Sequence, residues 1–80
     1  MVWRNVKQVM HMKKLKSNIG ELLDQSPYKR KYLMQRYGKS ANTISNWCRG
    51  KSFPSVPELF DLAMLLEVSV DDLYTKVDDK

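Results

Sequence analysis

Residues 38–51 read GKSANTISNWCRGK, and this stretch contains both the start and the end of one short helix. Ser40 is a good N-cap, because its hydroxyl can accept a hydrogen bond from an N–H group of the first turn. Gly50 is a good stop, because glycine adopts the left-handed conformation that ends many helices. One side of the helical wheel carries the apolar side chains of Ile44, Trp47 and Cys48. The stretch therefore predicts a helix over 41–49 with this side buried.

The opposite side of this helix is polar, and it carries the side chains of Asn42, Ser45, Asn46 and Arg49. A merely solvated face more often carries Lys and Glu four residues apart, since those residues stabilise helices and Asn does not. Asn pairs well with adenine in the major groove, Arg with guanine, and Ser with either. The pattern favours base reading, and a plain solvated face is the alternative.

A second helix is predicted directly before this one. Ser26 and Pro27 are typical of an N-cap followed by the first helical position, and Gly38 is a suitable C-terminal stop. The apolar face of this helix consists of Tyr28, Tyr32, Leu33 and Tyr37. Only Lys39 lies between Gly38 and the next N-cap, so the turn is very tight. This spacing is typical of a helix-turn-helix.

Three further helices are predicted from apolar periodicity and capping signals. The first covers 15–25; the fourth follows the capping box of Ser55 and Glu58 and covers 56–66; the fifth follows a similar pair, Ser69 and Asp72. The expected core positions of these helices are Leu15, Ile19, Leu22, Leu23, Leu59, Leu62, Ala63, Leu66, Val70, Leu73 and Val77. No segment shows sustained period-two alternation, so the predicted fold is all-α with five helices.

The predicted domain covers 15–77, between an N-terminal arm over 1–14 and a charged tail over 78–80. The arm is interpreted as flexible or loosely docked. A short amphipathic helix is the alternative, since the arm places apolar side chains at Val2, Val6, Val9 and Met10.

The charge is divided unequally along the 80 residues, whose formal net charge is +5. Residues 1–51 hold twelve Lys and Arg against two acids, which gives +10, whereas residues 52–80 hold two Lys against seven acids, which gives −5. One basic surface and one acidic surface favour a nucleic-acid partner over an anionic membrane.

The composition also excludes several classes of protein. One Cys and one His cannot form an internal disulfide or a Cys/His zinc site, and there is no Gly-rich phosphate loop or catalytic constellation. No apolar run approaches the roughly 20 residues that span a bilayer. We therefore expect an intracellular, soluble protein that is not an enzyme and needs no metal or cofactor.

In this order the residues resemble the Cro/cI-type, or Xre-like, helix-turn-helix family of phage and bacterial regulators, whose fold is lambda-repressor-like. The resemblance covers about residues 15–77, and its most specific part runs from Gly38 to Gly50 with Thr43-Ile44-Ser45 inside it. It implies five helices, with the third in the major groove of double-stranded DNA. The implied function is a sequence-specific transcriptional regulator, a repressor of phage or mobile-element type that occupies an operator.

The resemblance also assigns site residues by position. Those nearest the base edges are Ala41, Asn42, Ser45 and Asn46. Those expected to contact phosphates are Arg30, Lys39, Thr43, Arg49 and Lys51. Arg30 stands where the family commonly has Gln, and Arg is a sound donor to phosphate.

Four positions depart from the family pattern. Leu23 replaces a frequent Arg and is expected to expose apolar surface, and Met34 replaces a small Ala. Lys29 replaces the hydroxyl that usually caps the second helix, a loss that Ser26 is expected to offset. Glu67 replaces a common Gly.

A single domain of this kind reads few base pairs, so the resemblance favours a homodimer on two half-sites roughly 34–36 Å apart. The candidate interface is Val70, Tyr74 and Val77, or alternatively the arm around Trp3 and Val6. No small-molecule effector is expected, and the expected location is the cytoplasm of a bacterium or a phage-infected host. The alternative function is a protein-interaction module, such as an antitoxin or adaptor.

Overall fold

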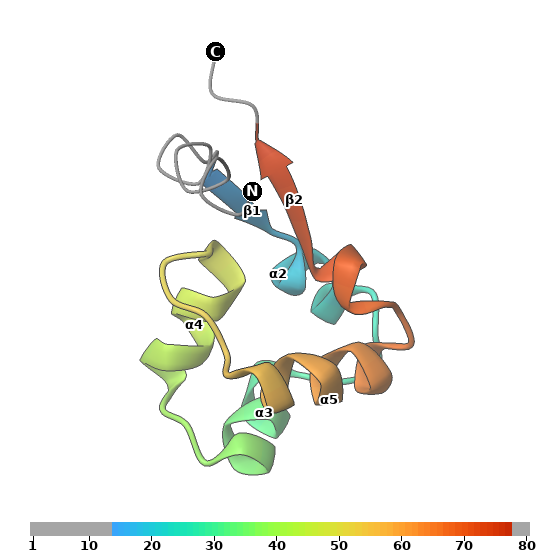
Figure 1. The fold of residues 1–80 in the computed structure, drawn as a ribbon. Coiled ribbons are helices and arrows are strands. Elements are labelled where there is room, and N and C mark those ends of the chain that lie inside the picture. Colours follow the sequence, from blue (N-terminus) through green and yellow to red (C-terminus); the bar gives the residue numbers. More distant parts are fainter. Residues whose placement is uncertain (1–13, 78–80) are drawn as a thin grey trace.

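The computed structural model describes residues 14–77. Its elements in chain order are β1 (Lys14–Ser17), α2 (Ile19–Asp24), α3 (Arg30–Tyr37), α4 (Ala41–Arg49), α5 (Val56–Leu66), the 3-10 turn η1 (Val70–Leu73) and β2 (Tyr74–Val77) (Figure 1). The predicted tail, and the predicted arm apart from Lys14, lie outside the described residues.

The described part of the chain is mostly helical, but the all-α prediction is wrong. β1 pairs antiparallel with β2, in a register that places Lys14 opposite Val77 and Ser17 opposite Tyr74. The predicted fifth helix is a single 3-10 turn that passes directly into β2. A strand of four residues has only two side chains on each face, which is too few for period two to be visible in the sequence. Within residues 14–77 the fold therefore has four α-helices and a two-stranded sheet.

The predicted first helix begins four residues too early. Leu15 lies exposed on β1, and α2 starts only at Ile19. Ser17 and Asn18 make the change of direction: the Ser17 hydroxyl donates to the Trp47 carbonyl at 2.7 Å, and the Asn18 N–H donates to the Leu73 carbonyl at 2.8 Å. These two bonds fix the start of α2 against α4 and η1.

The predicted start of the second helix is also wrong, because Ser26 does not cap α3. The Ser26 hydroxyl donates to the Leu23 carbonyl at 2.7 Å and accepts from the Tyr28 N–H at 3.1 Å. It therefore shapes a turn between the helices, and α3 begins at Arg30 with Lys29 as its N-cap and no capping side chain. Gly38 ends α3 in the left-handed conformation, as predicted.

The bounds of α4 and α5 are confirmed. The Ser40 hydroxyl accepts from the Thr43 N–H, and Gly50 ends α4 with a φ of 78°. The capping box of Ser55 and Glu58 is complete at the start of α5. Glu67 ends α5 with a φ of 60°, a conformation that costs a residue with a Cβ more than glycine.

The core lies between the helices and the 3-10 turn. Its buried side chains are Ile19, Leu23, Leu33, Ile44, Trp47, Leu62, Ala63 and Leu73. Leu23 is only 2% exposed, so the expectation that it exposes apolar surface is wrong. Met34 packs against this core as well. In Figure 1 the two strands rise above α2, whereas α3 and α5 lie at the bottom and α4 at the left.

Among residues 14–77, none of the helices has the length and apolar character needed to cross a membrane.

Candidate nucleic-acid interface

The tight turn between α3 and α4 sets the direction of α4. Gly38 is left-handed, and the Lys39 N–H donates to the Met34 carbonyl at 3.0 Å. The rings of Tyr37 and Trp47 pack with their centroids 5.7 Å apart, which joins the end of α3 to the inner side of α4. The turn and this contact hold α4 at a fixed angle to α3.

Three of the four predicted base-reading residues lie on the outer side of α4, and the fourth, Ala41, starts the helix. Ala41 and Asn42 are exposed in its first turn, and Ser45 and Asn46 are partly exposed farther along. The opposite side is buried through Ile44 and Trp47, as the wheel predicts. The structure therefore brings Asn42, Ser45 and Asn46 together on the open side of α4, with Ala41 exposed at the start of the helix.

A hydrogen bond within α4 orients one of these amides. Arg49 Nη2 donates to Asn46 Oδ1 at 3.3 Å. The amide oxygen of Asn46 therefore has a partner, which leaves its Nδ2 group free to donate outward. The sequence predicts both residues on this face but not the bond between them, although their i,i+3 spacing is a signal for it.

The N-terminus of α3 is open and basic. No side chain caps the N-terminus, and the Tyr32 N–H donates to the Lys29 carbonyl at 2.9 Å, so the N–H groups of Arg30 and Lys31 are left for another acceptor. A hollow of about 400 Å³ in front of it is lined by Leu23, Asp24, Ser26, Tyr28, Lys29, Arg30 and Lys31. Free N–H groups beside cationic side chains suit a phosphate, and Asp24 is the one carboxylate in the lining.

The other predicted phosphate contacts have different surroundings. Arg49 and Lys51 are exposed at the end of α4, and the Lys51 N–H donates to the Asn46 carbonyl at 2.9 Å. Thr43 is half-buried, and its hydroxyl accepts from Ser40 at 3.1 Å. Lys39 differs most, because its Nζ lies 3.8 Å from a carboxylate oxygen of Glu58. Part of its charge is therefore already balanced.

A charged cluster that sequence reasoning missed joins α3 to α5. Asp61 on α5 accepts hydrogen bonds from Arg36 and from the Tyr37 hydroxyl, and Arg36 also donates to the Tyr32 hydroxyl. These hydrogen bonds, with the positive charge of Arg36, lower the pKa of Asp61 to about 2. Partial burial and the neighbouring carboxylate raise the pKa of Tyr37. The cluster fixes the second half of α3 on the body of the domain.

The predicted dimer residues differ in how far they are exposed. Val70 and Tyr74 are half-buried and pack against the core. Val77 is 41% exposed on β2. The alternative positions, Trp3 and Val6, lie outside the described residues.

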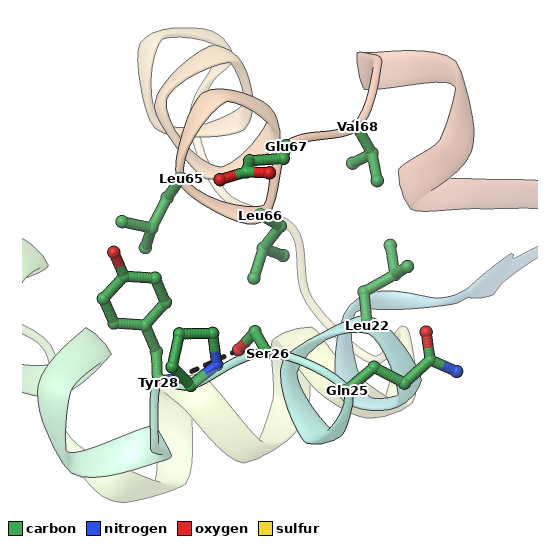
Figure 2. A pocket seen from close by; sticks show the side chains of 9 residues that line it. Leu22, Gln25, Ser26, Tyr28, Leu65, Leu66, Glu67 and Val68 are labelled. Carbon is green, nitrogen blue, oxygen red and sulfur yellow. Dashed lines mark hydrogen bonds between the residues drawn. The ribbon is translucent and has the colours of Figure 1, made fainter.

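A groove of about 260 Å³ separates the ends of α2 and α5 (Figure 2). Its lining is both polar and apolar and consists of Leu22, Gln25, Ser26, Pro27, Tyr28, Leu65, Leu66, Glu67 and Val68. The Ser26 hydroxyl is engaged by the turn described above. Over residues 14–77 there is no group of three or more His, Cys, Asp or Glu side chains that could hold a metal ion.

Comparisons with known proteins agree with this arrangement. A family model described as Helix-turn-helix matches residues 19–73, which extend from the start of α2 to the end of η1. The crystal structure of a candidate DNA-binding protein from Bacteroides fragilis is similar, with a TM-score of 0.67 and 36% sequence identity over 76% of this chain and 98% of that chain. A search of curated proteins found no match. The chain belongs to the Xre/cI-like helix-turn-helix family, with a lambda-repressor-like domain.

Proposed function

We propose that this protein is a sequence-specific regulator of transcription that binds double-stranded DNA. In this proposal it acts as a repressor of phage or mobile-element type, in the cytoplasm of a bacterium or a phage-infected host, by occupying an operator with α4 in the major groove. The observation that carries the proposal is the outer side of α4, where Asn42, Ser45, Asn46 and Arg49 gather opposite a buried apolar side. Side chains of this kind match the donor and acceptor pattern of base edges.

Each base reader has a distinct chemical role in this proposal. Asn46 donates from its free Nδ2 group and retains acceptor capacity on Oδ1, as pairing with adenine requires. Asn42 and Ser45 read neighbouring base edges. Ala41 offers only a methyl group, which suits contact with a thymine methyl.

Phosphate contacts at both ends of the α3–α4 unit fix its register on the duplex. Arg30 and the free N–H groups of α3 bind one phosphate, and Thr43, Arg49 and Lys51 bind others. Lys39 reaches a phosphate only by exchanging its contact with Glu58, so its contribution to affinity is smaller than that of Arg30.

Two copies are expected to bind as a homodimer on half-sites roughly 34–36 Å apart. No effector molecule is part of the proposal.

Selection from a randomised duplex library tests the proposal, followed by titration of the selected site at several salt concentrations. We expect Asn46→Ala to relax preference at one base position. Arg30→Ala should weaken binding to all sequences and reduce the salt slope by about one unit.

The matched control for Arg30→Ala is Lys76→Ala, which removes one positive charge from exposed β2. A regulator that reads DNA through α4 loses more affinity with Arg30→Ala than with this control. If no sequence is enriched and the two variants weaken binding equally, only a diffuse basic surface binds DNA and the proposal is wrong.

A second candidate function, the protein-interaction module, is favoured by the apolar side chains that α5 leaves exposed. Purification of a stable complex with another protein, with no sequence enriched in the library, would favour this candidate.

A further inference from the structure

Three large apolar side chains lie exposed in one row along α5. Val56 is 64% exposed, Phe60 63% and Met64 68%. Residues four apart lie on the same side of a helix, so these three form a continuous ridge, here called the α5 row. Contiguous exposed apolar surface of this kind marks an interaction site in soluble proteins.

The charged groups of α5 lie off this row and are already engaged. Glu58 accepts from the Ser55 N–H and lies near Lys39, and Asp61 is bound by Arg36 and Tyr37. The row itself has no charged member. A second copy of the same row would therefore meet it without repulsion between like charges.

The spacing of the row also suits a second copy. Val56 and Met64 each lie four residues from Phe60. A two-fold axis at Phe60 therefore pairs the row with itself in the antiparallel sense, with Val56 of one copy against Met64 of the other. Rows of residues four apart pack into each other at about −50°, the commonest crossing angle of helices in globular proteins.

We propose that two copies of this protein associate through their α5 rows, with Phe60 at the two-fold axis. None of the residues assigned to bases or phosphates belongs to the row. This surface differs from the one that includes Val77, and it deepens the proposed function, on which its DNA-dependent part rests.

The size of the row sets the strength of this dimer. A stable interface buries about 800 Å² on each partner. One aromatic side chain supplies at most about 150–250 Å², so a row of three, each already partly covered, falls well short of that area. The dimer is therefore weak in free solution and forms on DNA, where two adjacent half-sites raise the effective concentration of the second copy.

Disulfide trapping tests the row without DNA. In a Cys48→Ser background, Phe60→Cys places identical thiols opposite each other at the proposed axis, and Val77→Cys is the control on β2. We expect mild oxidation with diamide at high protein concentration to yield a disulfide-linked dimer at position 60 at least tenfold faster than at position 77. Equal or faster trapping at position 77, or none at position 60, would overturn the α5 row as the interface.

Binding to DNA supplies a second measurement. We compare duplexes that carry the selected half-site once or as an inverted repeat. On the repeat, we expect the first bound copy of the native chain to raise the affinity of the second copy roughly 5- to 150-fold. Phe60→Ser should remove this factor and leave binding to the single half-site unchanged. If Phe60→Ser keeps the cooperativity, the α5 row is not the interface. If the native chain binds no duplex specifically, the proposed function is wrong, and disulfide trapping at position 60 then tests the row by itself.

Discussion

Arg36 donates two hydrogen bonds to the carboxylate of Asp61, from Nε to Oδ2 at 2.7 Å and from Nη2 to Oδ1 at 2.9 Å. The Tyr37 hydroxyl donates to the same Oδ2 at 2.5 Å. A two-pronged contact of this kind fixes orientation as well as distance. It connects α3, the first helix of the DNA-binding unit, to α5, which carries the exposed apolar row.

Asp61 should make the stability of the domain depend on pH in the acid range. The pKa of Asp61 is about 2 in the folded protein, below its ordinary value of 3.8. Because the pKa of Asp61 is lower in the folded than in the unfolded protein, its ionised carboxylate stabilises the fold above about pH 4. This contribution is lost as the pH falls from about 4 to about 2. Thermal unfolding should therefore give a lower Tm for Asp61→Asn than for the native chain at pH 7, with the difference shrinking toward pH 2.

Glu21→Gln is the matched control, because it neutralises an exposed carboxylate on α2. Its Tm should differ little from that of the native chain at either pH. A Tm difference for Asp61→Asn that stays constant from pH 7 to pH 2 would contradict the assigned role of the charge.

Glu67→Gly should stabilise the protein. Glu67 ends α5 with a φ of 60°, and it is the one residue other than glycine with a positive φ among residues 14–77. The left-handed conformation costs a residue with a Cβ about 1–2 kcal/mol, and glycine avoids this cost. Glycine also raises the conformational entropy of the unfolded chain, which cancels part of the gain. We expect a net gain of about 0.5–1 kcal/mol in the free energy of unfolding by urea titration. Glu67→Gln keeps the strained backbone, so an equal gain in that variant would identify the charge, and not the backbone, as the cause.

The sequence predicts the elements whose signals are local, and it fails where the signals come from distant residues. Helix α4 begins and ends where Ser40 and Gly50 predict, and α5 begins where Ser55 predicts, because each cap acts within one turn. The sheet is missed because β1 pairs with a strand about sixty residues away. Ser26 misleads because a hydroxyl that shapes a turn and a hydroxyl that caps a helix look alike in sequence.

The candidate site follows the same rule. The open face of α4 is predictable, since the side of a helix depends only on its period. The contacts of Lys39 with Glu58 and of Arg36 with Asp61 are not, because they depend on how α3 and α5 cross. The α5 row left a signal in the sequence, since Val56, Phe60 and Met64 are as regularly spaced as the buried residues of the same helix.

Asn18→Ala should destabilise the junction between α2 and the sheet. The Asn18 side chain donates from Nδ2 to the Asp72 carbonyl at 3.1 Å and to the Thr75 hydroxyl at 2.9 Å. Loss of both bonds should lower the free energy of unfolding by about 1–2 kcal/mol, measured by urea titration. Asn18→Asp cannot donate to the Asp72 carbonyl, but its carboxylate can accept from the Thr75 hydroxyl and suits the N-cap of α2, so we expect it to lose less stability than Asn18→Ala. Native stability in Asn18→Ala would show that the two bonds contribute nothing.

Arg49 should affect DNA binding in two separable ways, through its charge and through its bond to Asn46. Arg49→Lys keeps the charge but loses the planar guanidinium that donates to Asn46 Oδ1 at 3.3 Å. We expect this variant to retain the salt slope of the native chain while its preference at the base read by Asn46 falls by about 1 kcal/mol, as measured on the selected site and its single-base variants. Arg49→Ala should lose the same preference and also reduce the salt slope by about one unit. Asn46→Ala removes the base reader itself, so Arg49 then has no amide to orient. The double variant Asn46→Ala, Arg49→Lys should therefore discriminate between bases as well as Asn46→Ala alone. If the second change lowers discrimination further, Arg49 reads a base directly instead of orienting Asn46.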